Sequence, residues 1–208
     1  MKGLGGSPVG TIKRRLIVGI SGASGFVYGQ RLLELLRPLD VEVHLVVSRA
    51  AKLTMACEST LKLAELHALA DQVHGNDDVG ACIASGSQRA LGMVIAPCSM
   101  KTLAEIATGN TASLISRAAE VTLKERRRLV LLARETPLTL SHLRNMVAVT
   151  EMGAIVAPPV PAFYARPANL AAMVDHTLGR VLDLFELDAG TAHRWAGVAA
   201  ERRGAGES

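Results

Sequence analysis

The sequence predicts an α/β protein with a three-layer, doubly wound parallel sheet of Rossmann-like topology. Five short runs rich in Val, Ile and Leu alternate with longer segments of helical period, which is the pattern of parallel strands covered by helices on both faces. The first run leads into a turn of glycine and serine, as in strand–turn–helix phosphate sites. At 208 residues, the chain suits one domain with a sizeable core.

The predicted strands and helices alternate from residue 15 onward. The strand-like runs are 15–20, 41–47, 92–97, 128–134 and 153–158. The segments of helical period are about 26–37, 49–70, 99–108, 111–126, 139–151 and 168–186. The stretch APPVPAFYARP at 157–167 is dense in proline, so we expect a shaped loop there. Ligands of such folds bind at the carboxyl ends of the strands.

We expect a single folded domain over residues 14–187. Residues 1–13 contain Gly, Pro and Lys without a hydrophobic signal core, and they are predicted to be a flexible N-terminal extension. Residues 188–208 are predicted to be a partly disordered C-terminal segment. The lack of an export signal favours the cytoplasm, and no run of about 18 apolar residues predicts a membrane span.

The composition favours a homo-oligomer that binds small phosphorylated ligands. Mean hydropathy is +0.27, which is high for a protein that buries apolar surface only within one subunit. The net charge is +4, yet three Phe, two Tyr and one Trp offer few surfaces on which nucleic-acid bases stack. The positive charge therefore suits small phosphates better than nucleic acid.

The cysteines and histidines show no metal-site or disulfide pattern. Cys57, Cys82 and Cys98 are odd in number and far apart, so we expect buried thiols rather than a disulfide framework. The six histidines lack a ligand spacing such as HxxxH. No catalytic metal is expected.

The opening turn GISGASG, residues 19–25, predicts a mononucleotide site. It departs from the G-x-G-x-x-G fingerprint, and Ser48 stands where a dinucleotide fold carries its ribose-binding acid. Ser24 and the backbone N–H groups at the following helix start are expected to hold one phosphate. The alternative is that the glycines only tighten a strand–helix turn. Ser99 and Thr102, in APCSMKTL, form a similar turn, where Ser99 either caps the helix or contacts a ligand.

Several long segments together resemble the UbiX flavin prenyltransferase family, which includes proteins described as components of aromatic acid decarboxylases. They are RLIVGISGASG, SRAA, APCSMKTL, RAAEVTLKERRRLVLLARETPL and PPVPAFYARP, and the resemblance covers about residues 14–196. It implies a flavodoxin-like flavoprotein fold and an FMN-binding domain. It also implies a metal-independent transferase that joins a dimethylallyl group from dimethylallyl phosphate to N5 and C6 of reduced FMN. The prenylated FMN goes to a UbiD-type decarboxylase, and relatives suggest a dodecamer of trimers with sites shared between subunits.

The resemblance also assigns site residues. The expected FMN-binding residues are Gly22, Ala23, Ser24, Ser48, Ser99, Met100, Lys101, Thr102 and Arg117. The expected donor-binding residues are Lys124, Arg134, Tyr164, Arg180 and Ser85. The expected catalytic residues are Glu135, Lys124, Tyr164, Glu58 and Trp195. Chemically, fixed cations and hydroxyl donors stabilise a departing phosphate. Glu135 is expected to relay a proton, and the aromatic face of Trp195 is expected to stabilise the cationic character of the prenyl fragment.

Two alternatives and several questions stay open. The alternatives to prenyl transfer are an FMN-dependent decarboxylase, as in related cysteine decarboxylases, and a non-catalytic accessory subunit of an aromatic acid decarboxylase. Those decarboxylases use a histidine near the flavin, and the first predicted helix here contains none. Phe26 stands where relatives carry a small residue. The sequence leaves undecided the downstream pathway, the subunit number and the preference for a monophosphate or diphosphate donor.

Overall fold

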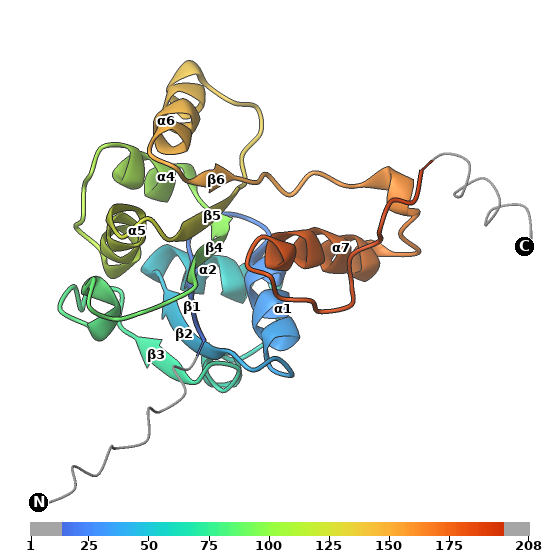
Figure 1. Ribbon diagram of the computed structural model, residues 1–208, viewed down its shortest axis with the longest axis horizontal. Helices are drawn as coiled ribbons and strands as arrows, with labels where there is room; N and C mark the ends of the chain where they lie inside the picture. Colours follow the sequence, from blue (N-terminus) through green and yellow to red (C-terminus); the bar gives the residue numbers. More distant parts are fainter. Residues whose placement is uncertain (1–13, 198–208) are drawn as a thin grey trace, which may run out of the picture.

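The structure, a computed structural model, describes residues 14–197 (Figure 1). The predicted flexible extension at 1–13 and the final part of the predicted C-terminal segment, 198–208, lie outside the described residues.

A six-stranded sheet forms the centre of the molecule, and all its neighbouring strands run parallel. Its strands are β1 (Arg15–Ile20), β2 (Glu42–Val47), β3 (Gln72–His74), β4 (Gly92–Cys98), β5 (Arg128–Ala133) and β6 (Ile155–Val156). They lie in the order β3-β2-β1-β4-β5-β6, which is the doubly wound order, with the direction of winding reversing between β1 and β4. The predicted fold class is confirmed.

The helices form one layer on each face of the sheet. They are α1 (Phe26–Leu36), α2 (Arg49–Glu58), α3 (Leu63–His67), α4 (Met100–Ala107), α5 (Leu114–Lys124), α6 (Leu140–Glu151) and α7 (Leu170–Asp183), with short 3-10 turns η1 (Cys82–Ala84) and η2 (Phe163–Ala165). Apolar side chains of α1, α2 and α7 join one buried cluster, and those of α4, α5 and α6 join a second. Figure 1 shows α1 and α7 together on one side of the sheet and α4, α5 and α6 on the other.

The central strands form where the sequence is almost continuously apolar. All residues of β4 are buried, and β1 is buried from Leu16 to Ile20. Such runs cannot present one polar face to water, so they require helices on both sides. This requirement explains why the sequence pattern predicts the layers correctly.

The elements differ from the sequence expectations in three places. The sequence analysis missed β3, because Gln72–His74 contains one apolar residue and forms a short, half-exposed edge strand. The expected helix at 49–70 divides into α2 and α3, because the backbone is extended at Ser59 and at Lys62. The last strand is also shorter than the expected 153–158.

Between β6 and α7 the chain runs out from the body of the molecule (Figure 1). Large apolar side chains on this arm and at the start of α7 face solvent, with 71% of Val160, 74% of Phe163 and 71% of Leu170 exposed. Isolated exposed apolar residues are common, but a group on one projecting segment is typical of an interface. Within residues 14–197, no helix has both the length and the apolar character needed to span a bilayer.

Helix α1 packs against the sheet at very short range through Gly29. A Cβ atom at this position would lie 2.5 Å from the Ala96 carbonyl oxygen and 2.7 Å from Ile20 Cδ1. The first of these contacts is with backbone, which cannot move aside easily. Gly29 therefore sets the distance between α1 and the strands that carry the loops described below.

We expect Gly29→Ala to destabilise the protein. In an open helical position this change would stabilise by about 1 kcal/mol, whereas the overpacking here should cost about 1–3 kcal/mol. Urea unfolding measures the difference, with Gly80→Ala as the control, since its nearest neighbour would be Asp78 Oδ1 at 3.6 Å. A more stable Gly29→Ala variant would contradict the close packing.

Candidate active site

The loops after β1 and β4 are joined by one buried side chain at the point where the winding reverses. Ser21 Oγ donates to the Pro97 carbonyl at 2.9 Å and accepts from the Ser99 backbone N–H at 2.7 Å. Only 1% of Ser21 is exposed, so both bonds are shielded from water. Sequence reasoning did not assign Ser21 a role. The feature of the sequence that could have indicated this role is a serine directly after an apolar strand.

A cavity of about 490 Å³ lies at this carboxyl edge of the sheet. Its lining includes Gly22, Ser48, Ala50, Asn76, Asp77, Ser99, Lys101, Thr102, Ser113 and Ile115. Cavities of a few hundred cubic ångströms are the size of small-molecule and cofactor sites. The position agrees with the general location of ligands in doubly wound sheets.

Three helices begin at the wall of this cavity, and each begins with a serine cap. Ser48 Oγ accepts from the Ala51 N–H at the start of α2, and Ser99 Oγ accepts from the Thr102 N–H at the start of α4. Ser113 caps α5 in the same way. Helix N-termini carry partial positive charge, so three of them at one cavity favour an anionic ligand.

Five of the predicted FMN-binding residues line this cavity together. They are Gly22, Ser48, Ser99, Lys101 and Thr102. A Cβ on Gly22 would lie 2.3 Å from Ala50 Cβ, so only glycine permits the β1 loop to pass α2 this closely. Lys101 forms an ion pair with Glu105 at 3.2 Å, while 82% of its side chain stays exposed.

The other predicted FMN-binding residues are not part of this lining. Ala23 and Ser24 lie in the same loop as Gly22, and Met100 packs against the buried cluster under α4 and α5. Arg117 lies on α5 and pairs with Glu120 at 2.5 Å. The structure therefore places these four beside the cavity or on its supporting elements.

Sequence reasoning missed the contribution of Asn76, Asp77 and Ser113. The Asn76 carbonyl accepts from the Leu114 N–H at 2.7 Å, and its side-chain oxygen accepts from the Ile115 N–H at 3.3 Å. This loop follows the missed strand β3, so no predicted strand end pointed to it. Ser113 did have a signal, since a serine directly before a helical run is a common N-cap.

The start of α1 bonds a carboxylate of the same chain, and the expected phosphate contact at this helix start stays a prediction. The Glu58 carboxylate, at the end of α2, accepts from the backbone N–H groups of Gly25 at 2.9 Å and Phe26 at 2.8 Å. The N-cap residue Gly25 has no side chain that could cap the helix. The Glu58 carboxylate takes this role, so the chain supplies its own anion at this helix start.

Hydrogen bonds keep the Glu58 carboxylate ionised. Partial burial raises its pKa, but the Ser24 side chain, the N–H groups of Phe26 and Gly25, and the positive charge of Arg134 together outweigh burial and lower the pKa below its usual value. The structure therefore brings Ser24, Glu58 and Arg134, all predicted site residues, to one corner of the sheet edge.

Arg134 and Glu135 directly follow β5, as predicted. The Arg134 N–H donates to the Cys98 carbonyl at 3.1 Å, which ties this loop to the end of β4. Both side chains are exposed. Glu135 Oε1 accepts from the Thr136 N–H at 3.0 Å, so one carboxylate oxygen is fixed in place.

A second group of predicted residues gathers around Tyr164 on the projecting arm. Tyr164 Oη lies 3.3 Å from His176 Nε2, and its ring meets the Trp195 ring edge-on at a centroid distance of 5.7 Å. Tyr164, His176 and Arg180 line a cavity of about 300 Å³. Arg180 pairs with Asp183 at 2.6 Å.

Lys124 and Ser85 form a third group at the far end of α5. Lys124 pairs with Glu125 at 2.5 Å, and both side chains lie against Gly86, where an added Cβ would be 2.8 Å from Lys124 Nζ. Ser85 Oγ is 2.9 Å from Ser87 Oγ. Glu120, four residues before Lys124 on α5, pairs with Arg117.

The predicted donor-binding residues are therefore divided within one chain. Figure 1 shows α5, which carries Lys124, on the opposite side of the sheet from η2 and α7, which carry Tyr164 and Arg180. Arg134 lies at the carboxyl edge of the sheet with Glu58. One copy of the chain does not bring these four cations and hydroxyl donors into one pocket.

The expectation of buried thiols holds for one cysteine only. Cys98 is buried, and burial raises the pKa of its thiol to about 12. Cys57 and Cys82 are exposed, which corrects the expectation for both.

Comparison with known proteins gives consistent matches over most of the chain. The Flavoprotein family profile matches residues 7–187. The flavin prenyltransferase UbiX of Neisseria meningitidis serogroup B is 55% identical over 186 residues, which are 89% of this chain and 98% of that protein. Sequence identity at this level, over nearly the whole of both chains, indicates membership of one family and not only a shared fold.

Two solved structures are also similar to this chain in both sequence and fold. AnUbiX (PadA1) in complex with FMN and dimethylallyl pyrophosphate has a TM-score of 0.87 and 51% identity, covering 89% of this chain and 98% of that one. A dodecameric FMN-dependent UbiX-like decarboxylase from Escherichia coli O157:H7 has a TM-score of 0.86 and 48% identity, covering 88% of this chain and 100% of that one.

We expect Glu58→Gln to lower stability at neutral pH but not in acid. A carboxylate at a helix start contributes about 0.5–1 kcal/mol through its charge, and solvent exposure keeps the value at the low end. Because the folded-state pKa is depressed, this contribution is complete above the unfolded-state pKa and disappears as pH falls through the folded-state pKa. Urea unfolding at pH 7 and at decreasing pH measures it.

The matched control is Glu151→Gln, at an exposed position at the end of α6. This change should not lower stability at any pH in the series, because a negative charge at a helix C-terminus is unfavourable. A difference between the unmodified protein and Glu58→Gln that is constant with pH would contradict a role for the charge.

Proposed function

The chain belongs to the UbiX flavin prenyltransferase family, and we propose how its own residues bind FMN and transfer the prenyl group. The reaction joins a dimethylallyl group from dimethylallyl phosphate to N5 and C6 of reduced FMN. The observation that carries the assignment is the cavity at the reversal point of the sheet, together with 55% identity to a flavin prenyltransferase over 89% of the chain.

The cavity fits FMN by size, charge and shape. It measures about 490 Å³, and the starts of α2, α4 and α5 provide an environment suited to the flavin phosphate. Gly22 keeps the wall free of a side chain where α2 passes closest. Ser48, Ser99, Lys101 and Thr102 supply hydroxyl and ammonium donors. The bound flavin supplies the two ring positions that accept the prenyl group.

The donor phosphate leaves toward fixed cations and a phenol. Cleavage of an allylic C–O bond produces an anion and a fragment with carbocation character. Lys124, Arg134 and Arg180 carry the positive charges in the proposed pocket, and Tyr164 adds a hydroxyl donor. The Trp195 ring, held edge-on against Tyr164, is placed to contact the cationic fragment through its face.

Glu135 is the proposed proton carrier. It is exposed beside Arg134, with one oxygen already fixed by the Thr136 N–H, so its second oxygen is available to a bound ligand. Glu58 differs, because two backbone donors and Ser24 keep it ionised. We therefore assign proton transfer to Glu135 and orientation of the β1 loop to Glu58.

We infer that the complete donor pocket forms between subunits of a homo-oligomer. One chain separates Lys124 and Ser85 from Tyr164 and Arg180, on opposite sides of its sheet. The projecting arm exposes Val160, Phe163 and Leu170, which is the surface expected of a contact with another copy. The similar E. coli protein is dodecameric.

The product is proposed to serve a UbiD-type decarboxylase, and the expected cytoplasmic location stays a prediction.

The decisive experiment incubates the protein with reduced FMN and dimethylallyl phosphate under anaerobic conditions. We expect a flavin product heavier than FMN by one five-carbon unit in mass spectrometry, and a parallel reaction with the diphosphate compares the two donors. Unmodified FMN, from a protein that nonetheless stimulates a decarboxylase, would favour an accessory role. Loss of carbon dioxide from an added acid without flavin modification would favour direct decarboxylation.

Within this assay, Glu135→Gln should retain binding of FMN and donor but lower kcat by roughly 100-fold, the lower range for loss of a general acid–base group. Stopped-flow absorbance measures the rate, and flavin fluorescence measures binding. The Glu151→Gln control should keep full activity. Full activity in Glu135→Gln would remove the proposed proton transfer from this residue.

A further inference from the structure

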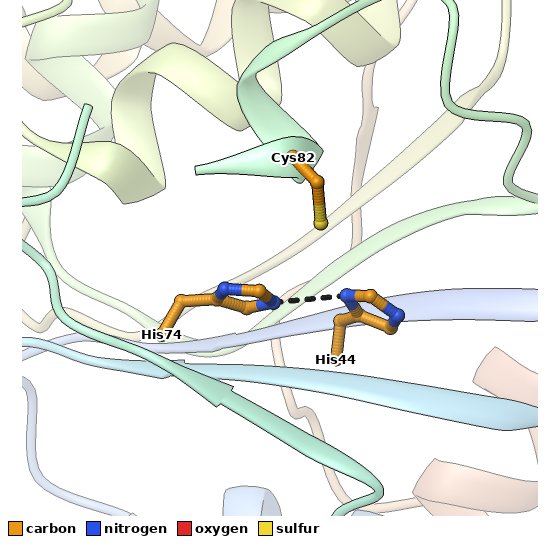
Figure 2. A group of neighbouring side chains, drawn as sticks. All are labelled: His44, His74 and Cys82. Carbon is orange, nitrogen blue, oxygen red and sulfur yellow. Dashed lines mark hydrogen bonds between the residues drawn. The ribbon is translucent and has the colours of Figure 1, made fainter. Parts of the chain in front are cut away.

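Three potential metal ligands converge at the edge of the sheet, in a place that prenyl transfer does not use. His44 comes from β2, His74 from β3 and Cys82 from η1 (Figure 2). One ligand atom from each lies within 4.8 Å of the other two. Figure 2 shows the Cys82 side chain pointing toward the gap between the two imidazole rings.

The pairing of β2 with β3 brings the histidines to the same face. Val46 is the partner of His74, and His44 lies two residues before Val46, so both side chains project to one side of the sheet. His44 Nδ1 and His74 Nε2 are 2.9 Å apart, and the rings stack with an interplanar angle of 21°. The turn η1 then lies over this face, because Ile83 packs into the cluster that also contains Val46.

The remaining nitrogen of His44 faces a carboxylate. His44 is 1% exposed, and its Nε2 is buried without a hydrogen-bond partner within the described part of the chain. It lies 3.4 Å from Glu42 Oε1, and Glu42 is held by Arg15 at 2.9 Å. A carboxylate behind the second nitrogen is the usual support of a metal-bound histidine, since it fixes the ring and increases the basicity of the ligand nitrogen.

The charges around the site leave the two rings available as ligands. Burial lowers the pKa of His44 and of His74, assisted at His44 by Arg15 and by His74 itself. Burial thus acts toward the neutral form of both rings, which is the form that binds a metal. The Arg15 charge is offset by its pairing with Glu42, and the Asp78 carboxylate adds negative charge near His74.

We propose that His44 Nδ1, His74 Nε2 and the thiolate of Cys82 bind one Zn²⁺ ion, with water as the fourth ligand. Two nitrogens and one sulfur are a ligand set that zinc favours. On binding, the Cys82 thiol releases its proton to solvent, and the hydrogen bond between the rings is replaced by two Zn–N bonds. The ring that donated this hydrogen bond shifts its proton to its other nitrogen, so that both neutral rings carry the proton on the nitrogen remote from the ion. The nitrogens need to separate from 2.9 Å to about 3.3 Å for tetrahedral zinc.

Such an ion would fix the edge of the sheet rather than take part in catalysis. It would join β2, β3 and η1. It would thereby restrain both ends of the segment 75–81, which carries Asn76 and Asp77 to the cavity at the carboxyl edge of the sheet. Ser85 follows η1 directly. The simpler interpretation is a hydrogen-bonded pair of core histidines with a cysteine nearby and no metal ion. The two interpretations differ in whether Cys82 and the histidines bind a metal together.

The test is a titration of the full-length, tag-free, chelator-treated protein with Co²⁺, followed by displacement with Zn²⁺. We expect one Co²⁺ per chain, with a thiolate-to-cobalt charge-transfer band and visible bands of tetrahedral intensity. Cys82→Ser should abolish the charge-transfer band and weaken Zn²⁺ binding at least tenfold, and His74→Gln should also weaken it at least tenfold. Cys57→Ser, which removes the other exposed cysteine, is the matched control and should keep both properties.

Thermal unfolding provides a second measurement that does not depend on prenyl transfer. One equivalent of Zn²⁺ should raise the Tm of the unmodified protein and of Cys57→Ser, but not that of Cys82→Ser. The proposal is overturned if no charge-transfer band appears, or if the band and the Tm increase persist in Cys82→Ser. Circular dichroism of each variant establishes that it is folded, and a prenylation assay on the same samples keeps this result separate from the main activity.

Discussion

The functional site depends on the connection between β1 and β4 through Ser21. Because the sheet winds in opposite directions from these two strands, the loops after them diverge, and a cavity opens between the helices that follow. The buried Ser21 hydroxyl bonds to both the Pro97 carbonyl and the Ser99 N–H, which sets the position of Ser99 and the start of α4. The short distance at Gly29 holds α1 against the same two strands. The cavity geometry therefore follows from backbone packing, before any ligand contact is considered.

The helix starts around this cavity are used in two different ways. At α1 the protein provides its own carboxylate, Glu58, which satisfies the first N–H groups and remains ionised. At α2 and α4 a serine satisfies only part of the N-terminal donors, because each helix begins with four N–H groups that have no partner within the helix. At α5, Asn76 and Ser113 together accept from the first three N–H groups. The starts of α2 and α4 therefore retain donors suited to an anion, whereas the first N–H groups at α1 and α5 already bond oxygens of the chain itself.

The sequence predicted the layers and half of the site for identifiable physical reasons. Apolar runs such as β4 are long enough to be read directly, and Ser48 and Ser99 stand immediately after such runs. The strand β3 was missed because Gln72–His74 is short and mostly polar, and Asn76 was missed with it. The contact of Glu58 with Gly25 spans 33 residues and has no local pattern. The position of Lys124 away from Tyr164 depends on packing on opposite faces of the sheet, which no motif contains.

Two of the three proposed phosphate-binding cations are already paired with carboxylates, and this pairing is suited to ligand exchange. Lys124 pairs with Glu125 and Arg180 with Asp183, and about half of each cationic side chain is exposed, 49% and 55%. Ion pairs at this exposure contribute about 0–1 kcal/mol, so a phosphate replaces the carboxylate at little cost. The pairs also keep the long side chains extended near their working positions, which reduces the conformational entropy lost on binding. A pocket assembled from several copies can thus keep its cations soluble and ordered in each chain before a ligand arrives.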